Sequence, residues 1–248
     1  MRTEKNWYRA WFDSAYYHLL YRKDHEREAM AFTTRLVAFL QPFPGALMLD
    51  AACGKGRPAT ELATFGYDVT GIDLSEKNIL EARKMEHAHL SFFQHDIRLP
   101  LRIRYFDYAF SFFTGFGYFD TERENENALH TMCHALRKDG VLLIDCLNSS
   151  YVEQHLVSHE MKIVDGVEFN IQRACEGGYF LTEIHISDPA RLAEQQFTER
   201  LRAYSRDDLE NMLSAQGMQI VDILGDYQFH PWQECSSPRL ILIAKRVS

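Results

Sequence analysis

Short apolar runs alternate with amphipathic segments between residues 45 and 150 of this 248-residue chain. The runs are brief and bounded by turn-forming residues, which favours strands, whereas the segments between them repeat apolar residues at helical spacing. The predicted strands cover residues 47–49, 67–72, 90–93, 106–113 and 140–145, and the predicted helices cover residues 57–65, 75–85 and 122–136. Strands separated by helices in this way predict a parallel sheet.

The pattern changes after residue 151, where apolar and polar residues alternate along several consecutive segments. Asp165-Gly166 and Glu176-Gly177-Gly178 lie between these segments and are typical of hairpin turns. The predicted strands here cover residues 160–164, 167–174, 179–186 and 195–203. We therefore expect an antiparallel sheet inserted after the fifth parallel strand.

Helices and two further strands are predicted at the ends of the chain. Residues 7–40 carry aromatic and aliphatic residues at three- and four-residue steps, and the prolines and glycine at 42–45 end this helical region. Ser205 is a hydroxyl N-cap for a last helix that closes at Gly217. The final predicted strands cover residues 219–224 and 240–245.

Composition narrows the class of protein. A chain of this length with 46% hydrophobic residues can bury one core with an elaboration, and needs no second independent domain. The formal net charge of -8 and the lack of a Lys/Arg-rich run argue against a nucleic-acid partner. No stretch approaches the roughly 20 apolar residues of a membrane span and the N-terminus is polar, so we expect no membrane partner and a cytoplasmic protein.

The cysteines and the other potential ligands do not predict a metal site. Five cysteines are widely spaced and form no CxxC pair. This arrangement suggests neither a disulfide framework nor a zinc site of thiolates, and we expect no metal.

A glycine loop follows the first predicted strand. That strand runs into Asp50, and Gly54 and Gly56 come directly before the next helix. Glycines at such a turn let a ligand lie against the backbone, and the helix N-terminus favours an anionic group. Asp73 ends the next strand, a position from which a carboxylate can bind both hydroxyls of a ribose.

Two cofactors are compatible with this loop. Gly54-x-Gly56-x-x-Ala59 also satisfies the dinucleotide fingerprint, so an NAD(P)- or flavin-dependent oxidoreductase is the alternative. Asp50 precedes the glycines, however, and Asp96 follows the third strand. A buried carboxylate at Asp50 suits a cofactor that carries a free ammonium group better than it suits a pyrophosphate.

With these motifs in order, the sequence resembles the class I S-adenosylmethionine-dependent methyltransferases over residues 45–150 and the terminal strands. The resemblance implies S-adenosyl-L-methionine as cofactor. It assigns the methionine part to the first loop, the ribose to Asp73 and the adenine to Leu74, Asp96 and Ile97. The implied cofactor-binding residues are Asp50, Ala51, Ala52, Gly54, Gly56, Arg57, Asp73, Leu74, Asp96, Ile97, Phe112 and Phe113. Ala52 stands where the family often has glycine.

The resemblance also implies the fold class. We expect an α/β protein with a Rossmann-like, seven-stranded, mostly parallel sheet, helices on both faces, the last strand antiparallel, and an inserted antiparallel β cap. The expected parts are an N-terminal helical lid at residues 1–44, a cofactor-binding core at 45–150, the cap at 151–204, and a C-terminal helix and strands at 205–248 that complete the core.

The implied reaction is methyl transfer to an N, O or C atom of a small molecule. The tetrapeptide of nucleobase-methylating relatives is absent, since residues 111–114 read Ser-Phe-Phe-Thr. The glycine-flanked aromatic loop that follows suits the wall of an apolar or cationic substrate site. The substrate-binding candidates are Phe116, Tyr118 and Trp232. The cap could cover the substrate or form a dimer interface, so a monomer and a homodimer both remain open.

A catalytic base is optional, because a sulfonium methyl is already activated and the protein mainly has to align the acceptor. The candidates for such a base are His18, His25, His185 and His230, with Tyr16 and Tyr17 as further catalytic candidates. Arg22 or Arg27 could bind the cofactor carboxylate. A binding or scaffold protein that keeps the fold without turnover is a third possibility.

Overall fold

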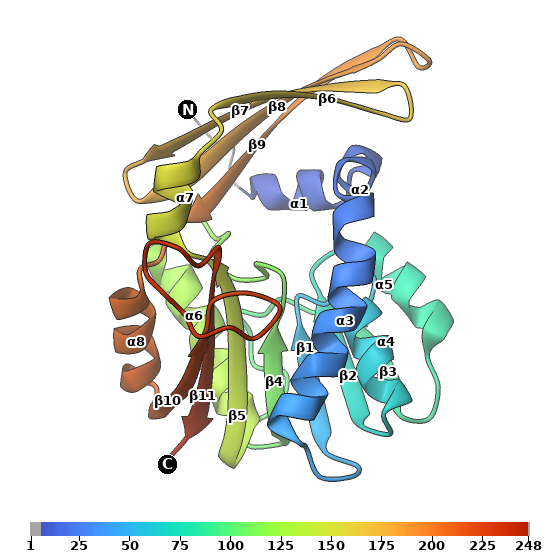
Figure 1. Cartoon of the computed structure of the whole chain (residues 1–248). Helices are drawn as coiled ribbons and strands as arrows, with labels where there is room; N and C mark the ends of the chain where they lie inside the picture. Colours follow the sequence, from blue (N-terminus) through green and yellow to red (C-terminus); the bar gives the residue numbers. More distant parts are fainter. Residues whose placement is uncertain (1–5, 248) are drawn as a thin grey trace.

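The computed structural model describes residues 6–247, except for the side chains of residues 22–30. It contains a seven-stranded sheet with helices on both faces and a separate four-stranded sheet above one end of it (Figure 1). Among the described residues, no helix is both long enough and apolar enough to cross a membrane.

The described elements agree closely with the predicted ones. The helices are α1 (Trp7–Phe12), α2 (Ala15–Leu20), α3 (Arg22–Leu40), α4 (Arg57–Thr64), α5 (Glu76–Ala82), the short 3-10 helix η1 (Arg83–Met85), α6 (Glu122–Ala135), α7 (Ser149–His155) and α8 (Arg206–Ala215). The strands are β1 (Leu47–Ala51), β2 (Asp68–Asp73), β3 (Leu90–Gln94), β4 (Phe106–Ser111), β5 (Leu136–Leu147), β6 (His159–Val164), β7 (Val167–Glu176), β8 (Tyr179–Asp188), β9 (Ala193–Arg202), β10 (Met218–Leu224) and β11 (Arg239–Arg246).

The large sheet has the order β3-β2-β1-β4-β5-β11-β10. Strands β1 to β5 pair in parallel, and β11 is antiparallel to both of its neighbours. The predicted Rossmann-like sheet with an antiparallel last strand is therefore confirmed. Successive side chains of a strand point to opposite faces, so the near-continuous apolar runs of β1, β4, β5 and β11 supply two cores at once.

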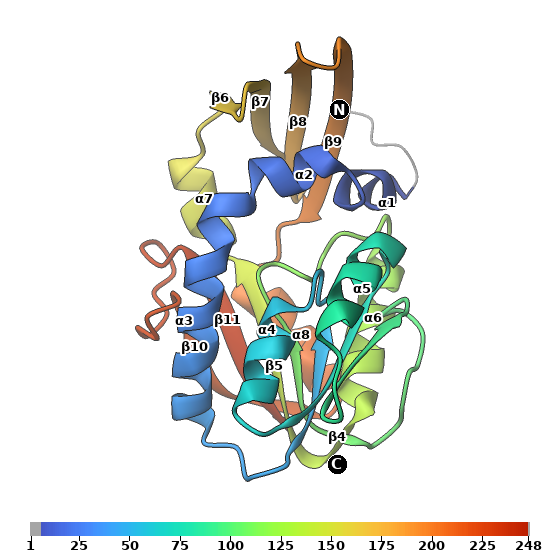
Figure 2. The ribbon, with the colours of Figure 1, turned by 90° about the vertical axis from the view of Figure 1, so that its right-hand side faces the viewer.

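One core lies under α3, α4 and α5, and the other lies under α6 and α8. Phe32, Leu62 and Ile79 join the first, whereas Leu129 and Leu209 join the second. Figure 2 shows α3 and α6 on opposite sides of the sheet. This arrangement leaves the carboxyl ends of the parallel strands free of helices, so ligand-binding loops can gather there.

The inserted sheet has the order β6-β7-β8-β9, with all pairs antiparallel. Its inner face carries the buried residues Phe169, Ile171, Ile184 and Ile186, which join the core cluster of α6 and α8. In Figures 1 and 2 this sheet lies over α1 and α2, and α1 contacts β9. Helices α1 and α2, the N-terminal helices, thus lie between the two sheets.

Local capping explains where two helices begin. Ser205 accepts a hydrogen bond from the backbone of Asp208, whose side chain in turn accepts one from the backbone of Ser205. Thr121 and Glu124 form the same reciprocal arrangement at α6. Each capping box satisfies two backbone donors that would otherwise lack partners. The predicted N-cap at Ser205 is confirmed.

Helix α7 was not predicted, and its position depends on a long-range contact. The buried Asn148 just before it donates two side-chain hydrogen bonds of 2.7 Å to the carbonyls of Glu234 and Ser237. These partners lie in the loop before β11, so no local pattern around residues 149–155 could reveal them.

Gly56 packs against the ring of Phe92, and this contact should limit substitution. Gly56 and Gly45 have nearly equal φ values of 76° and 74°. A Cβ on Gly56 would lie 2.4 Å from Phe92, whereas a Cβ on Gly45 would meet nothing within 4 Å. Both alanine variants carry the cost of a left-handed residue, about 1–2 kcal/mol. We expect Gly56→Ala to lose a further 1–3 kcal/mol or so from overpacking, measured as the free energy of unfolding in urea. Equal losses in the two variants would contradict this.

Candidate cofactor and acceptor site

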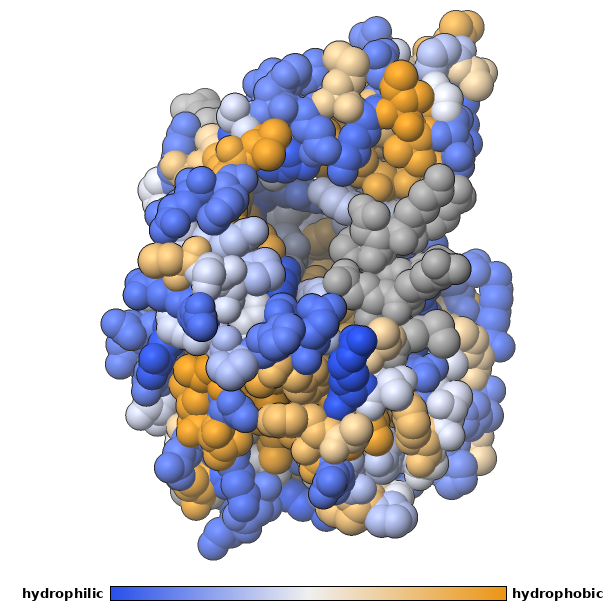
Figure 3. Space-filling view, viewed as in Figure 1, coloured by the Kyte–Doolittle hydropathy of each residue, from blue (hydrophilic) through white to orange (hydrophobic). Residues whose placement is uncertain are grey.

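Two adjoining cavities open at the carboxyl ends of the parallel strands. The first cavity has a volume of about 300 Å³ and is lined by residues that include Asp50, Gly54 and Phe113. The second cavity has a volume of about 230 Å³ and is lined by residues that include Leu74 and Asp96. Phe12, Ala52, Asp73, Gly115 and Tyr118 line both. Figure 3 shows a hollow between the upper sheet and the core, above which the four-stranded sheet forms a roof.

The second cavity is organised around Asp96. Its carboxylate pairs with Arg98 at 2.6 Å, and Arg98 also pairs with Glu124 at 2.5 Å and lies 4.6 Å above the ring of Phe119. Burial alone would raise the pKa of Asp96, but hydrogen bonds from Arg98 outweigh it and lower that pKa. Asp96 is therefore an ionised acceptor in a fixed orientation, beside the apolar Ile97.

The first cavity contains a buried carboxylate oxygen without a partner. Asp50 is 1% exposed, and its Oδ2 has no hydrogen-bond partner among the described residues. Burial and the neighbouring charge of Asp73 raise the pKa of Asp50 well above its usual range. A buried acceptor of this kind is costly unless a ligand donor satisfies it. An ammonium group would do so.

Asp73 connects the glycine loop to the next helix. Its Oδ2 accepts a hydrogen bond of 2.9 Å from the backbone of Gly54, and its Oδ1 accepts one of 2.8 Å from Ser75. Gly54 has a φ of 55°, and a Cβ placed there would meet nothing within 4 Å. The backbone of the loop therefore faces open space, which a ligand can approach closely. Together with the free oxygen of Asp50, this geometry fits a cofactor with a ribose and an ammonium group.

The segment after β4 is fixed by a buried charge pair. Phe113 and Thr114 have φ values of 50° and 62°, a conformation that is costly for residues other than glycine. The fully buried Asp145 accepts hydrogen bonds from the Phe113 backbone at 2.8 Å and pairs with Arg239 at 2.5 Å. Arg239 also donates to the hydroxyl of Thr114 at 2.8 Å. The pair thus holds this wall of the first cavity in place.

The N-terminal helices close the cavities from the other side. Asp13 accepts a hydrogen bond from the hydroxyl of Ser75, and its backbone oxygen accepts one of 3.2 Å from Lys77. These bonds fix the turn between α1 and α2 above the β2–α5 connection. As a result, Phe12 lines both cavities, and Tyr17 lines the first.

His18, one of the base candidates, also lines the first cavity. Burial and the positive charges of Lys55 and Arg57 lower its pKa to about 4. The usual value is about 6.5. Between these two values the unfolded chain binds a proton that the folded chain does not, so stability falls as pH drops from about 6.5 to 4.

We expect the His18→Gln variant to lose less stability than the unmodified protein between pH 7 and pH 5. The measurement is the urea midpoint at the two pH values. His185→Gln, at an exposed position on β8, is the matched control for the substitution itself. If the urea midpoint of His18→Gln fell between pH 7 and pH 5 by as much as that of the unmodified protein, the lowered pKa of His18 would be contradicted.

The structure brings most of the predicted cofactor residues to the cavities. Asp50, Gly54, Arg57, Phe112 and Phe113 line the first cavity, Leu74, Asp96 and Ile97 line the second, and Ala52 and Asp73 line both. Ala51 and Gly56 line neither, since Ala51 is buried within β1 and Gly56 lies at the N-terminus of α4. Ala52 adopts a φ of 62°, and its methyl group faces Gly115.

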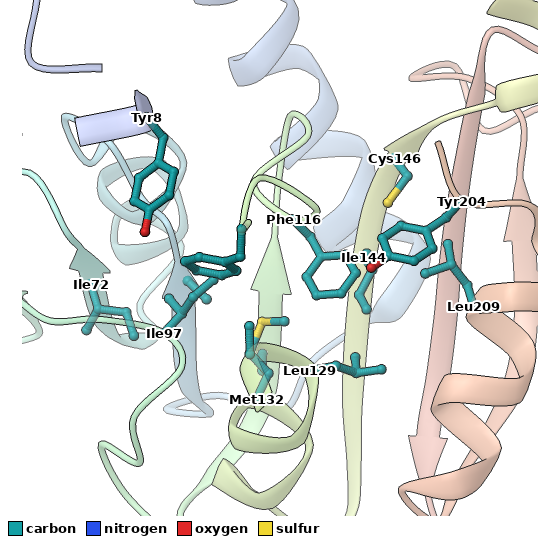
Figure 4. Packing of buried hydrophobic residues seen from close by; sticks show 14 of the residues in the cluster. Tyr8, Ile72, Ile97, Phe116, Leu129, Met132, Ile144, Cys146, Tyr204 and Leu209 are labelled. Carbon is teal, nitrogen blue, oxygen red and sulfur yellow. The ribbon is translucent and has the colours of Figure 1, made fainter. Parts of the chain in front are cut away.

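Two of the three predicted substrate residues lie outside the cavities. Phe116 is 1% exposed and stacks on Tyr204 with ring centroids 5.5 Å apart in the core, and Figure 4 shows Phe116 near Ile144 and Tyr204 next to Leu209. Trp232 packs against the core cluster below Arg206, whose guanidinium lies 5.8 Å from the ring. Tyr118, by contrast, lines both cavities. The sequence alone could not decide which aromatic residue of this loop faces the cavities and which one packs in the core.

Several predicted catalytic candidates also lie elsewhere. Tyr16 donates to the buried Asp188 at 3.0 Å, and the exposed His230 pairs with Asp226 at 2.7 Å. His185 is exposed on the cap. The side chains of His25, Arg22 and Arg27 lie outside the described residues. Among the predicted catalytic candidates with described side chains, Tyr17 and His18 line the first cavity.

Sequence reasoning missed some residues that the structure places at the cavities. Phe12, Asn78, Thr114 and Gly115 line the first cavity, and Tyr8 lines the second. The positions of Phe12 and Tyr8 depend on where the N-terminal helices dock, which no local pattern shows. Thr114 and Gly115 belong to two segments expected at the site, the end of the fourth strand and the glycine-flanked loop, although neither is among the residues predicted to bind. Within the described part of the chain, no group of three or more potential ligands is placed to bind a metal ion.

Comparisons with known proteins support an assignment for this geometry. Residues 48–140 match the methyltransferase domain family. A protein of Geobacillus sp. (strain WCH70), provisionally named a methyltransferase, is 25% identical over 209 residues, covering 80% of this chain and 84% of the relative.

Solved structures extend the likeness to most of the chain. An S-adenosylmethionine-dependent methyltransferase from Clostridium acetobutylicum ATCC 824 aligns with a TM-score of 0.79 at 18% identity, covering 94% of this chain and 96% of that one. An amino pentose methyltransferase from Micromonospora echinaspora, solved with S-adenosylmethionine bound, aligns with a TM-score of 0.71 at 21% identity, covering 94% and 97%. These two structures share the fold. The matched domain at residues 48–140 and the homologous sequence, together with this shared fold, support a class I S-adenosylmethionine-dependent methyltransferase.

Proposed function

We propose that this methyltransferase acts on an N, O or C atom of a small molecule that binds in the first cavity. The observation that carries the proposal is the composition of that cavity. Its floor consists of the glycine loop, with Lys55 and Arg57, and the segment after β4. Its other walls are Asp73, Asn78, aromatic residues from α1 and α2, and the tyrosines Tyr21 and Tyr118. A volume of about 300 Å³ beneath a roof, part of which the methionine end of the cofactor would fill, suits a small acceptor better than a polymer.

The proposed cofactor contacts follow from the donors and acceptors present. Asp50 would accept from the ammonium group, and Asp73 would accept from the ribose hydroxyls. In the second cavity, Leu74 and Ile97 would contact the adenine faces, with Asp96 at the edge of the ring. S-adenosylmethionine supplies an electrophilic methyl group on a sulfonium, and the protein's own task is to orient an acceptor and exclude water.

We further propose the four parts expected from the sequence as functional units. Residues 1–44 would act as a lid, 45–150 as the cofactor-binding core, 151–204 as a cap over the acceptor, and 205–248 as the completion of the core. The contact of α1 with β9 supports a cap that acts together with the lid. A dimer interface on the cap, and hence a homodimer, remains the alternative to a monomer.

The experiment uses S-adenosylmethionine with a labelled methyl group and a lysate of the source organism, separated into small-molecule, protein and nucleic-acid fractions. We expect label in the small-molecule fraction. Label confined to the protein or nucleic-acid fraction would refute the proposal. A protein that binds S-adenosylhomocysteine by calorimetry but labels no fraction would favour a scaffold role, and binding of NAD(H) alone would favour the oxidoreductase.

A further inference from the structure

One carboxylate on the roof lies in an otherwise apolar row. Phe197, Glu199 and Leu201 alternate along β9 and therefore point to the same face of the sheet. Phe197 packs on Trp11 with ring centroids 4.7 Å apart, and Leu201 is buried. Glu199 thus points toward the N-terminal helices, where an apolar residue would be expected.

The surroundings of Glu199 are mostly aromatic, and burial raises the pKa of its carboxyl although the positive charge of Arg173 acts in the opposite direction. Its Oε1 accepts hydrogen bonds from the indole N–H of Trp11 and from the hydroxyl of Tyr21 at 3.3 Å, and its Oε2 lies 3.4 Å from the same hydroxyl. Among the described side chains, no cation lies within ion-pair distance of it. Arg173, on the same face of the cap, pairs instead with Glu160 at 2.9 Å. A carboxylate removed from water without a cation partner is costly.

The charge of Glu199 affects the pKa of three tyrosines that line the first cavity. These are Tyr17, Tyr21 and Tyr118. Burial raises the pKa of each of them, and the charge of Glu199 raises it further. Tyr17 and Tyr21 contact each other with ring centroids 5.2 Å apart, and Phe12 contacts both Tyr17 and Tyr118. The side of the cavity formed by these residues is thus aromatic with a negative charge behind it, whereas Lys55 and Arg57 line the cavity from the glycine loop.

We infer that the methyl acceptor is an amine, bound in its ammonium form against these tyrosine rings, with the charge of Glu199 behind them. Aromatic faces and a carboxylate both attract a positive charge, and both do so more strongly when water is excluded. A neutral hydroxyl or carbon acceptor would gain nothing from the charge of Glu199. The inference rests on the proposed function, because it specifies which small molecules the first cavity accepts.

The charge balance of amine methylation agrees with this arrangement. The bound ammonium first releases one proton to water. The nitrogen lone pair then forms the new N–C bond while the C–S bond breaks, and sulfur keeps its electron pair. The positive charge moves to nitrogen, so the product is again an ammonium. Both the incoming and the outgoing form of the acceptor therefore carry the charge that Glu199 attracts.

The test compares two probes of the same shape, choline and 3,3-dimethyl-1-butanol, which differ in the charge of the central atom. Neither is a methyl acceptor in this design, so binding alone is measured. The protein is saturated with S-adenosylhomocysteine, and the indole N–H signal of Trp11 is followed by NMR. We expect choline to bind at least ten-fold more tightly than the alcohol. In Glu199→Gln, the choline affinity should fall at least ten-fold and the alcohol affinity should stay the same.

Glu194→Gln is the matched control, since Glu194 is exposed on the same strand. Equal binding of the two probes, binding of neither, or unchanged choline affinity in Glu199→Gln would overturn the inference. Labelled small molecules in the lysate experiment would then still support the proposed function. If the label appeared only in macromolecules, the proposed function itself would fail.

Discussion

Replacing Asp73 by alanine is expected to weaken binding of S-adenosylhomocysteine by roughly 2–4 kcal/mol, about 30- to 1000-fold in the dissociation constant. The variant would lose the charge-assisted hydrogen bonds that the Asp73 carboxylate is proposed to accept from the ribose hydroxyls. It also accepts from the backbones of Gly54 and Ser75, so the glycine loop loses its support as well. The measurement is isothermal titration with S-adenosylhomocysteine.

The same strand supplies the control for this variant. Asp68 lies at the opposite end of β2, where it contacts His89 at 2.6 Å, and it lines neither cavity. We expect Asp68→Ala to bind the thioether with unchanged affinity. An unchanged affinity in Asp73→Ala would refute the role proposed for Asp73.

The second large effect concerns stability. Asp145→Ala leaves the guanidinium of Arg239 largely buried without its carboxylate. Removing one partner of a buried ion pair typically costs 3–5 kcal/mol or so, because the remaining charge is no longer compensated. The variant also loses the hydrogen bonds from the Phe113 backbone and from the hydroxyl of Tyr227. We expect a loss of about 3–5 kcal/mol in the free energy of unfolding, measured in urea.

A second aspartate on β5 distinguishes a buried pair from an exposed one. Asp139 pairs with Lys245 at 2.9 Å, but both side chains are exposed. We expect Asp139→Ala to leave the urea midpoint almost unchanged, because solvent screens an exposed pair. If the two variants lost similar stability, the buried pair would not be what holds the segment after β4.

The sheet could be predicted because each strand carries its own pattern. The runs at 106–113 and 140–145 are almost wholly apolar, as expected of strands covered on both faces. Strand β5 is nevertheless longer than predicted and starts at Leu136. Residues 136–139 are mostly polar, so their pattern does not distinguish a strand from the end of the preceding helix.

The site could be predicted only where its residues end strands. Asp50, Asp73 and Asp96 follow three parallel strands, whose carboxyl ends meet at one edge of the sheet. The structure brings all three to the adjoining cavities. The aromatic wall depends instead on how α1 and α2 pack against the rest of the protein. Phe116 lies in the core, where it stacks on Tyr204. Glu199 did leave a signal, as a charge in an apolar row.

The shared walls of the two cavities constrain how such a protein can diverge. Tyr17 and Tyr21 line the first cavity alone, so under the proposed assignment mutations there would change acceptor choice and leave the proposed adenosyl pocket unaltered. Phe12 and Tyr118 belong to both. Under the same assignment, substitutions at these two positions would change donor affinity and acceptor choice together, so they would be poor positions at which to engineer a new specificity.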